Sequence, residues 1–173
     1  MKNFTPRIKN NVRLTRRDRI NSKVPKVNPF AVCAMAIDNC ININLIYRSL
    51  ANFAGIEMFV VGPSNWHKGA TNGLDEVVKI TYFNTVNEFL SFMEKTDYEM
   101  VAIEQSDKSV YLTEFEHPKK PCFIFGNEGF GLGDDILLNV DKVVEIPMQG
   151  YHPCLNVGVS SGIIFYDFVR RNG

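Results

Sequence analysis

The sequence predicts an α/β domain that is built on a mainly parallel sheet with helices on both faces. Short, continuously apolar runs alternate along the chain with stretches of helical period. Such runs are typical of strands buried on both faces, and their alternation with helices favours βαβ connections. The chain has 173 residues, of which 45% are hydrophobic, so it can form one domain with a real core.

The predicted elements follow one another with short connections. Residues 42–54 carry one apolar stripe and end at Gly55, which is the pattern of a helix with a glycine stop. Residues 86–95 are expected to form an amphipathic helix, residues 155–171 the final helix, and residues 63–77 a loop. The predicted strands are residues 30–37, 56–62, 77–83, 99–105, 121–126 and 142–148.

Charge is unevenly placed along the chain, although the net charge is zero. Residues 1–27 hold nine Lys or Arg against one acid, a net +8, and the remainder holds ten bases against 18 acids, a net −8. We therefore divide the chain into a basic arm, residues 1–27, and a folded domain, residues 28–173. Three interpretations of the arm stay open: a polyanion-binding segment, a disordered tail in solvent, or a mitochondrial transit segment.

Composition also limits the class of protein. No apolar run approaches the roughly 18 residues that span a bilayer, and no secretory signal is visible. The four cysteines form no CxxC pair, and the three histidines show no metal-ligand spacing. We expect reduced cysteines, no metal and no membrane association, in the cytoplasm or, if the arm is a transit segment, in mitochondria.

A glycine-rich stretch, FIFGNEGFGLGDDI (123–136), connects a predicted strand to a helix-like start. It fails the dinucleotide pattern, because Asp134 stands where the third glycine should be, and the P-loop pattern, because Leu132 replaces lysine. Asp134 and Asp135 would repel an anion at the helix start. The stretch therefore favours a cationic or zwitterionic ligand over a nucleoside triphosphate, although it could equally be a tight turn without a ligand.

Three segments occur in a recognisable order, and each falls on a strand–loop–helix junction. They are NINLIYRSLANFAGIEMFVVG (42–62), IFGNEGFGL (124–132) and IPMQGYHPCLNVGVSSGI (146–163). Together they resemble the signature motifs of the SpoU (TrmH) family of SPOUT RNA ribose 2′-O-methyltransferases, over about residues 30–171. The segment VAIEQSDKSVYL (101–112) is similar, less specifically, to the tRNA-modifying branch of that family.

The resemblance implies a SPOUT fold with a C-terminal trefoil knot, S-adenosylmethionine as methyl donor, and a homodimer. It also implies a structured RNA substrate, with tRNA favoured over rRNA. Gly126 would lie against the cofactor, where a Cβ would push the ligand away. The residues that the resemblance places at the cofactor are Phe125, Gly126, Asn127, Gly129, Ile146, Met148, Cys154 and Leu155.

Arg48 matches the arginine of the family's first motif. It lies opposite the apolar stripe of its helix, in a row with Asn44 and Asn52. One role is the base that deprotonates the ribose hydroxyl, but a guanidinium rarely gives up its proton. We favour binding of the adjacent phosphate and stabilisation of the developing alkoxide. If the arm also binds RNA, its candidate residues are Arg13, Arg16, Arg17 and Arg19.

Three further matches complete the predicted catalytic set: Asn42, Glu128 and Asn156. Glu128 could hydrogen-bond other motif residues or accept a proton. Each has a plainer interpretation, because asparagine is a good helix N-cap and Glu128 could be a solvated turn acid. Cys154 departs from the serine that the family commonly carries, and a thiol is a weak donor. This departure supports an alternative function, a knotted module that binds RNA or cofactor with little or no turnover.

Overall fold

The computed structural model describes residues 8–9, 12–13, 27–62 and 78–172. The loop predicted at residues 63–77 lies outside the described residues, as do three of the arm's four candidate RNA-binding arginines, Arg16, Arg17 and Arg19. Within the arm, β1 (Ile8–Lys9) pairs antiparallel with β2 (Val12–Arg13). Arg13 therefore lies in one of two short paired strands, and the three interpretations of the arm stay open.

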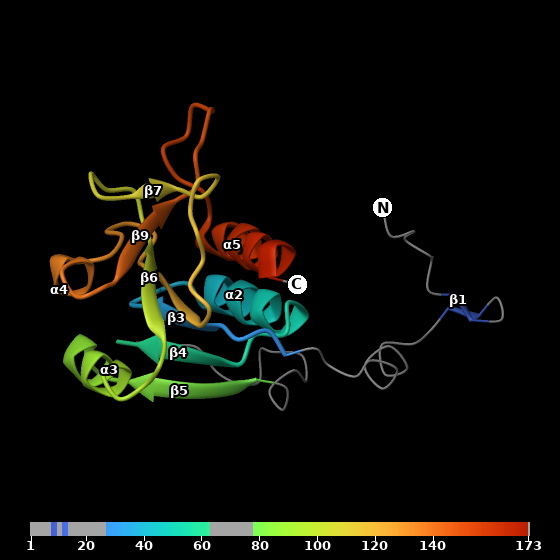
Figure 1. The fold of residues 1–173 in the computed structure, drawn as a ribbon, viewed down its shortest axis with the longest axis horizontal. Helices are drawn as coiled ribbons and strands as arrows, with labels where there is room; N and C mark the ends of the chain where they lie inside the picture. The colour runs from blue at the N-terminus through green and yellow to red at the C-terminus, as the bar shows by residue number, and fades with distance from the viewer. Residues whose placement is uncertain (1–7, 10–11, 14–26, 63–77, 173) are drawn as a thin grey trace.

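A seven-stranded sheet forms the centre of the domain, and every neighbouring pair in it is parallel. The strand order is β5-β4-β3-β8-β6-β9-β7 (Figure 1). This confirms the predicted parallel sheet and all six predicted strands, and adds one short strand at an edge. The strands are β3 (Ala31–Met35), β4 (Glu57–Val61), β5 (Lys79–Phe83), β6 (Glu99–Ile103), β7 (Val110–Tyr111), β8 (Pro121–Phe125) and β9 (Lys142–Glu145).

Helices cover both faces of the sheet, as the sequence predicts (Figure 1). On one face lie α2 (Cys40–Asn52) and α5 (Val157–Asn172), and on the other α3 (Val86–Met93) and the short α4 (Asp134–Leu137). Because side chains alternate along a strand, β3 sends Val32 to the core under α2 and α5 and Cys33 to the core under α3 and α4. The continuous apolar runs thus serve two separate cores.

The pair α2 and α5 packs closely, and a glycine makes this possible. A Cβ at Gly158 would lie 2.6 Å from the Cβ of Leu45 on α2. Ser161 is fully buried in the same helix and donates its hydroxyl to the carbonyl of Gly158, 2.8 Å away. Close contact of these two helices fixes where α5 begins, and hence where the third motif lies relative to the first.

Candidate active site

A cavity of about 350 Å³ opens beyond the carboxyl ends of β6, β8 and β9, the end at which parallel α/β sheets bind ligands. Every residue predicted to bind the cofactor lines it, except Gly129. Two predicted catalytic residues, Glu128 and Asn156, also line it. The lining residues are Ile103, Glu104, Gln105, Phe125, Gly126, Asn127, Glu128, Gly131, Glu145, Ile146, Met148, Cys154, Leu155, Asn156, Val157 and Ser160.

The glycine-rich loop turns back on itself directly after β8. The N–H of Asn127 donates to the carbonyl of Gly131 (3.2 Å), and the N–H of Gly131 donates back to the carbonyl of Asn127 (2.9 Å). A Cβ at Gly126 would lie 2.5 Å from the carbonyl carbon and oxygen of Gly131. The first glycine is thus required by the return of the loop itself, which differs from the expected clash with a ligand.

Asn127 ties this loop to the end of β3. Its Nδ2 donates to the carbonyl of Ala36 (2.8 Å) and to the carboxylate of Asp38 (3.0 Å). Its Oδ1 accepts the N–H of Gly129 at 2.7 Å. The Asn127 side chain is therefore occupied in shaping the loop, and Gly129 lies in the exposed turn rather than on the cavity wall.

Asn42, Glu128 and Asn156, one from each motif, form a single hydrogen-bonded chain that we call the site network. The Oδ1 of Asn156 accepts the N–H of Gly158 at 2.9 Å, so its Nδ2 faces Asn42 and donates to Oδ1 there, also at 2.9 Å. Asn42 then directs its own Nδ2 at the carboxylate of Glu128. Each amide fixes the orientation of the next, and Glu128 is held at the cavity.

The N-cap interpretation is correct for Asn156 and wrong for Asn42. Asn156 precedes the first residue of α5 and accepts a backbone N–H of its first turn, so it caps the helix and joins the site network. The cap of α2 is Asn39, whose side chain accepts the N–H of Ile41. Asn42 lies inside the helix and is only 5% exposed, which leaves its amide for the network.

Arg48 is not brought to the cavity of its own chain. It is exposed on α2 and does not line the cavity. It lies six positions after Asn42 in the helix, about 9 Å along the axis. The predicted position on the polar face of the helix is confirmed, but one chain alone does not bring the first motif's arginine to the other three residues.

The cavity is acidic. Its lining holds the carboxylates of Glu104, Glu128 and Glu145, and among its described lining residues none is Lys or Arg. Glu145 accepts the hydroxyl of Ser109 at 2.8 Å. Such a site suits a cation and repels a triphosphate, as the glycine stretch predicts. The sequence analysis did not predict Glu104, Gln105 and Glu145 as cavity residues. For Glu104 and Gln105 the only signal was the less specific similarity of residues 101–112 to the tRNA-modifying branch of the family.

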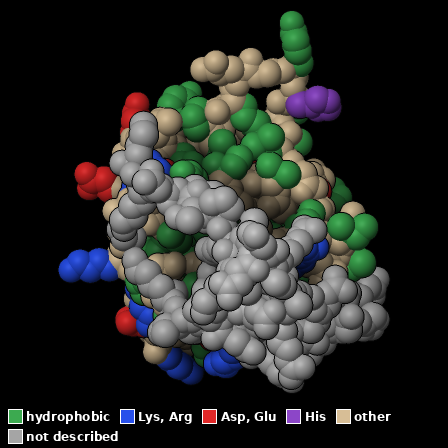
Figure 2. Space-filling view, turned by 90° about the vertical axis from the view of Figure 1, so that its right-hand side faces the viewer, with side chains coloured by type: hydrophobic (Ala, Val, Ile, Leu, Met, Phe, Trp, Pro, Cys, Tyr) green, Lys and Arg blue, Asp and Glu red, His purple; other side chains and the backbone are tan. Residues whose placement is uncertain are grey.

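The remaining candidates are placed simply. Cys154 is exposed and lines the cavity next to Leu155. Tyr151 and His152 are exposed on the segment between β9 and α5, which projects at the top of Figures 1 and 2.

In the described ranges, no three His, Cys, Asp or Glu side chains lie close enough to hold a metal ion. No helix within those same ranges is long and apolar enough to cross a membrane.

The SpoU rRNA Methylase family matches residues 29–166 of the chain. The chain belongs to this family. The tRNA (guanosine(18)-2′-O)-methyltransferase of Escherichia coli K12 is 26% identical over 162 residues, which cover 91% of this chain and 70% of that enzyme.

Solved structures agree with this membership. The A. aeolicus TrmH/SpoU tRNA modifying enzyme is 27% identical, with a TM-score of 0.73, over 86% of this chain and 77% of that one. An AdoMet-bound rRNA methyltransferase from Sinorhizobium meliloti has a TM-score of 0.75 at 18% identity, over 85% of this chain and 58% of that one. The second likeness shows a shared fold.

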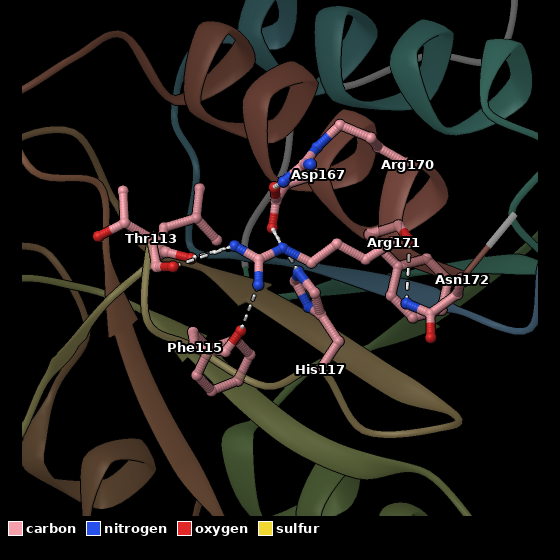
Figure 3. Close-up of polar contacts among 9 residues, drawn as sticks. Thr113, Phe115, His117, Asp167, Arg170, Arg171 and Asn172 are labelled. Carbon is pink, nitrogen blue, oxygen red and sulfur yellow. Dashed lines mark hydrogen bonds and ion pairs between the residues drawn. The ribbon is translucent and has the colours of Figure 1, made fainter.

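This SpoU-family chain carries a second polar cluster, at the other end of α5, that we call the anchor network (Figure 3). Its acceptor is the carboxylate of Asp167. His117 Nε2 lies 2.9 Å from one of its oxygens, and guanidinium nitrogens of Arg170 and Arg171 lie at 2.8 Å and 2.9 Å from its oxygens. Arg171 also donates to the carbonyls of residues 112, 113 and 115. The network therefore ties the last turns of α5 to the segment that follows β7.

The protonation states of the anchor network follow from its burial. The His117 side chain is 1% exposed, and its Nδ1 has no hydrogen-bond partner among the described residues. Burial lowers the pKa of His117, against the opposing effect of Asp167. Burial acts to raise the pKa of Asp167, but hydrogen bonds from Arg170, His117 and Arg171 outweigh it and lower that pKa. A neutral histidine thus faces an ionised carboxylate.

Proposed function

We propose that this SpoU-family chain transfers a methyl group from S-adenosylmethionine to a ribose 2′-hydroxyl of RNA. The observation that carries the proposal is the site network. Three residues that are distant in sequence, Asn42, Glu128 and Asn156, are joined by hydrogen bonds, and two of them line one acidic cavity. Each lies in a different one of the three segments by which the sequence resembles the RNA methylase family, whose match covers residues 29–166.

The residues that line the cavity fit this cofactor. Ile146, Met148 and Leu155 give an apolar surface for an adenine ring, and the loop after β8 presents backbone groups beside it. The carboxylates of Glu104, Glu128 and Glu145 suit a ligand that carries a sulfonium and an ammonium group. When bound, the cofactor supplies an electrophilic methyl group.

The transfer forms a bond between the ribose 2′ oxygen and the methyl carbon, breaks the bond from that carbon to sulfur, and releases the hydroxyl proton. The protein's main task is in-line placement of the two reacting groups. Glu128 has one carboxylate oxygen engaged by Asn42, and its second oxygen can accept a proton. Arg48 binds the adjacent phosphate and stabilises the alkoxide that develops.

tRNA is the proposed substrate class, in preference to rRNA. The E. coli relative is named as a tRNA methyltransferase, and the chain spans 70% of its length. The basic arm, with its net charge of +8, suits a polyanion. Because RNA contacts through such an arm depend on salt, removal of residues 1–27 should weaken RNA binding and flatten its salt dependence, without changing cofactor affinity.

A homodimer with sites built from both protomers completes the proposal. Two observations support it: Arg48 is exposed and away from its own chain's cavity, and apolar side chains are exposed on α2 and α5. These are Ile41 (62%), Leu45 (38%), Val159 (51%) and Tyr166 (58%). Light scattering should give a dimer at micromolar concentration, and a 20 kDa-scale monomer would contradict it. The trefoil knot stays a prediction.

One assay separates the enzyme from the alternative, a module that binds without turnover. Purified full-length protein is incubated with methyl-labelled S-adenosylmethionine and total RNA. We expect label in RNA, and in its tRNA fraction in particular. Cofactor binding without label in any RNA would instead support the binding module, for which the thiol of Cys154 in place of serine is the sequence argument.

A further inference from the structure

The residues that follow β6 stand between two loops of the cavity. In the sheet, β6 lies between β8 and β9, and those strands lead into residues 126–132 and 146–156. Glu104 and Gln105 follow β6 directly, and both line the cavity. The backbone N–H of Glu104 donates to the carbonyl of Val144 on β9 at 3.1 Å. This pair of residues is therefore fixed to the sheet at the point where both loops begin.

Glu104 holds the first loop. Its Oε2 accepts the N–H of Leu132 at 2.9 Å, and its Oε1 accepts the N–H of Gln105, also at 2.9 Å. Gly131 has a φ of +68°, and a Cβ there would lie 2.4 Å from Oε2 of Glu104. Glycine at this position thus permits both the left-handed turn and the close approach of the carboxylate.

Gln105 holds the second loop. Its Nε2 donates to the carbonyl of Pro153 at 2.7 Å. Pro153 immediately precedes Cys154 and Leu155, which line the cavity. Residues 146–156 belong to no helix or strand, so this bond attaches an otherwise irregular segment to the end of β6.

We infer that Glu104 and Gln105 form a brace that fixes the two cofactor loops relative to each other. Both line the cavity, and both act as positioning residues because each also holds a backbone group of a loop. Loops held in place before binding do not have to be ordered by the ligand, which improves affinity. The brace rests on the proposed function only where cofactor affinity is concerned, since its effect on the loops exists without a ligand.

Hydrogen exchange of the full chain without cofactor tests the brace directly. The N–H groups of Leu132 and Gln105 approach different oxygens of Glu104. Glu104→Gln replaces one of these oxygens by a donor NH2 and should speed exchange in residues 126–132. Gln105→Glu loses the donor to Pro153 and should speed exchange in residues 149–156. Each variant should affect its own loop more than the other. Asp107→Asn is the matched control, because Asp107 is exposed and lies off the cavity.

Cofactor affinity provides the second measurement. Each variant should raise the dissociation constant for S-adenosylmethionine about three- to tenfold, the range for one net hydrogen bond. The KM for cofactor should rise likewise, because both residues hold loops that line the cavity. Glu104→Ala, which removes both acceptors, should exceed Glu104→Gln in both exchange and affinity.

Two results would overturn the inference: exchange in both loops equal to wild type, or faster exchange with unchanged cofactor affinity. Failure of the proposed function is a separate outcome, since wild-type protein would then bind no S-adenosylmethionine. Exchange in the ligand-free variants would still decide whether Glu104 and Gln105 hold the loops.

Discussion

The two ends of α5 carry polar clusters in different surroundings, one beside an open cavity and one enclosed by the protein. At its first turn, the site network joins Asn156 to Asn42 and Glu128 beside an open cavity. Near its last turn, the anchor network encloses His117 between aromatic rings and pairs Asp167 with two arginines. Both clusters contain a carboxylate held by neighbouring donors, yet only the first has a carboxylate that faces a space where a ligand fits.

The difference shows that hydrogen bonding alone does not identify a reactive group. Glu128 is exposed and has an oxygen that the described contacts leave for other partners. The carboxylate of Asp167 is surrounded by His117 and the two arginines, and its side chain is only 12% exposed. We therefore expect substitutions near the site network to reduce turnover, and substitutions in the anchor network to reduce the free energy of unfolding.

The largest expected effect is on turnover. Arg48→Ala should lower kcat by at least about a thousandfold, near 4 kcal/mol, because it removes the charge that stabilises the alkoxide. Cofactor affinity should stay near wild type, since Arg48 does not line the cavity. Asn52→Ala, on the same exposed side of α2, is the control and should keep activity. Near-normal turnover by Arg48→Ala would remove this arginine from the mechanism.

The anchor network should show the opposite pattern. Asp167→Ala leaves His117 and Arg171 without their shared acceptor, which should cost about 3 kcal/mol of unfolding free energy, the upper end for loss of hydrogen bonds to a charged group. Urea unfolding measures this loss, and cofactor affinity of the folded fraction should not change. Loss of cofactor affinity with an unchanged free energy of unfolding would show that the anchor network acts on the cofactor site and not on stability.

Low pH should reduce the unfolding free energy through His117, which belongs to the anchor network and not to the site network. Its folded pKa lies below the unfolded value of about 6.5, so the unfolded state binds more protons and stability rises with pH. The stability that neutral His117 contributes is complete above about pH 6.5 and is lost as pH falls through its lowered folded pKa. The lowered pKa of Asp167 acts in the same direction at lower pH.

A series of urea unfolding curves between about pH 7.5 and pH 5 measures this effect. His117→Gln should flatten the dependence of unfolding free energy on pH over that interval. His152→Gln is the control, because His152 is exposed, and it should leave the slope as in wild type. If the two histidine variants behave alike, burial of His117 is not the source of acid sensitivity.

The smallest expected effect concerns Cys154. Cys154→Ser should keep or raise activity, because serine is the better donor at this cavity position and adds no bulk. Steady-state kinetics with RNA and cofactor check it. A loss greater than about tenfold, roughly 1.4 kcal/mol of transition-state stabilisation, would assign the thiol a role of its own.

Local pattern was sufficient to predict the sheet and its layers. Buried strands such as Ala31–Met35 appear as continuous apolar runs because both faces of each strand are covered. The edge strand Val110–Tyr111 was missed, because two exposed residues carry no such pattern. The beginning of α2 was also predicted late: its cap is Asn39, and Asn42 is an equally good cap residue by type alone.

The site was predictable only in part. The motif resemblance selected residues that line one cavity and allowed Glu128 a hydrogen bond to other motif residues. It did not indicate that Asn42 would be that partner, or that Asn156 would join them, across 86 and 114 positions. The anchor network had no signal in the sequence, because it depends on long-range packing of residue types that are ordinary at a surface. The brace had only the weak family similarity of residues 101–112, which did not indicate its contacts with the two loops. Gly126 lines the cavity, and no sequence pattern indicated its close approach to Gly131 within the loop.

The central claim is that methyl transfer occurs at a ribose oxygen, at the end of α5 that carries the site network. Methyl-labelled RNA from reactions with wild type, Arg48→Ala and Asp167→Ala is digested with alkali, which cleaves only where a ribose 2′-hydroxyl is free. We expect an alkali-resistant labelled dinucleotide from wild type and from folded Asp167→Ala, and none from Arg48→Ala. Label released entirely in mononucleotides would place the methyl group on a base and contradict the account.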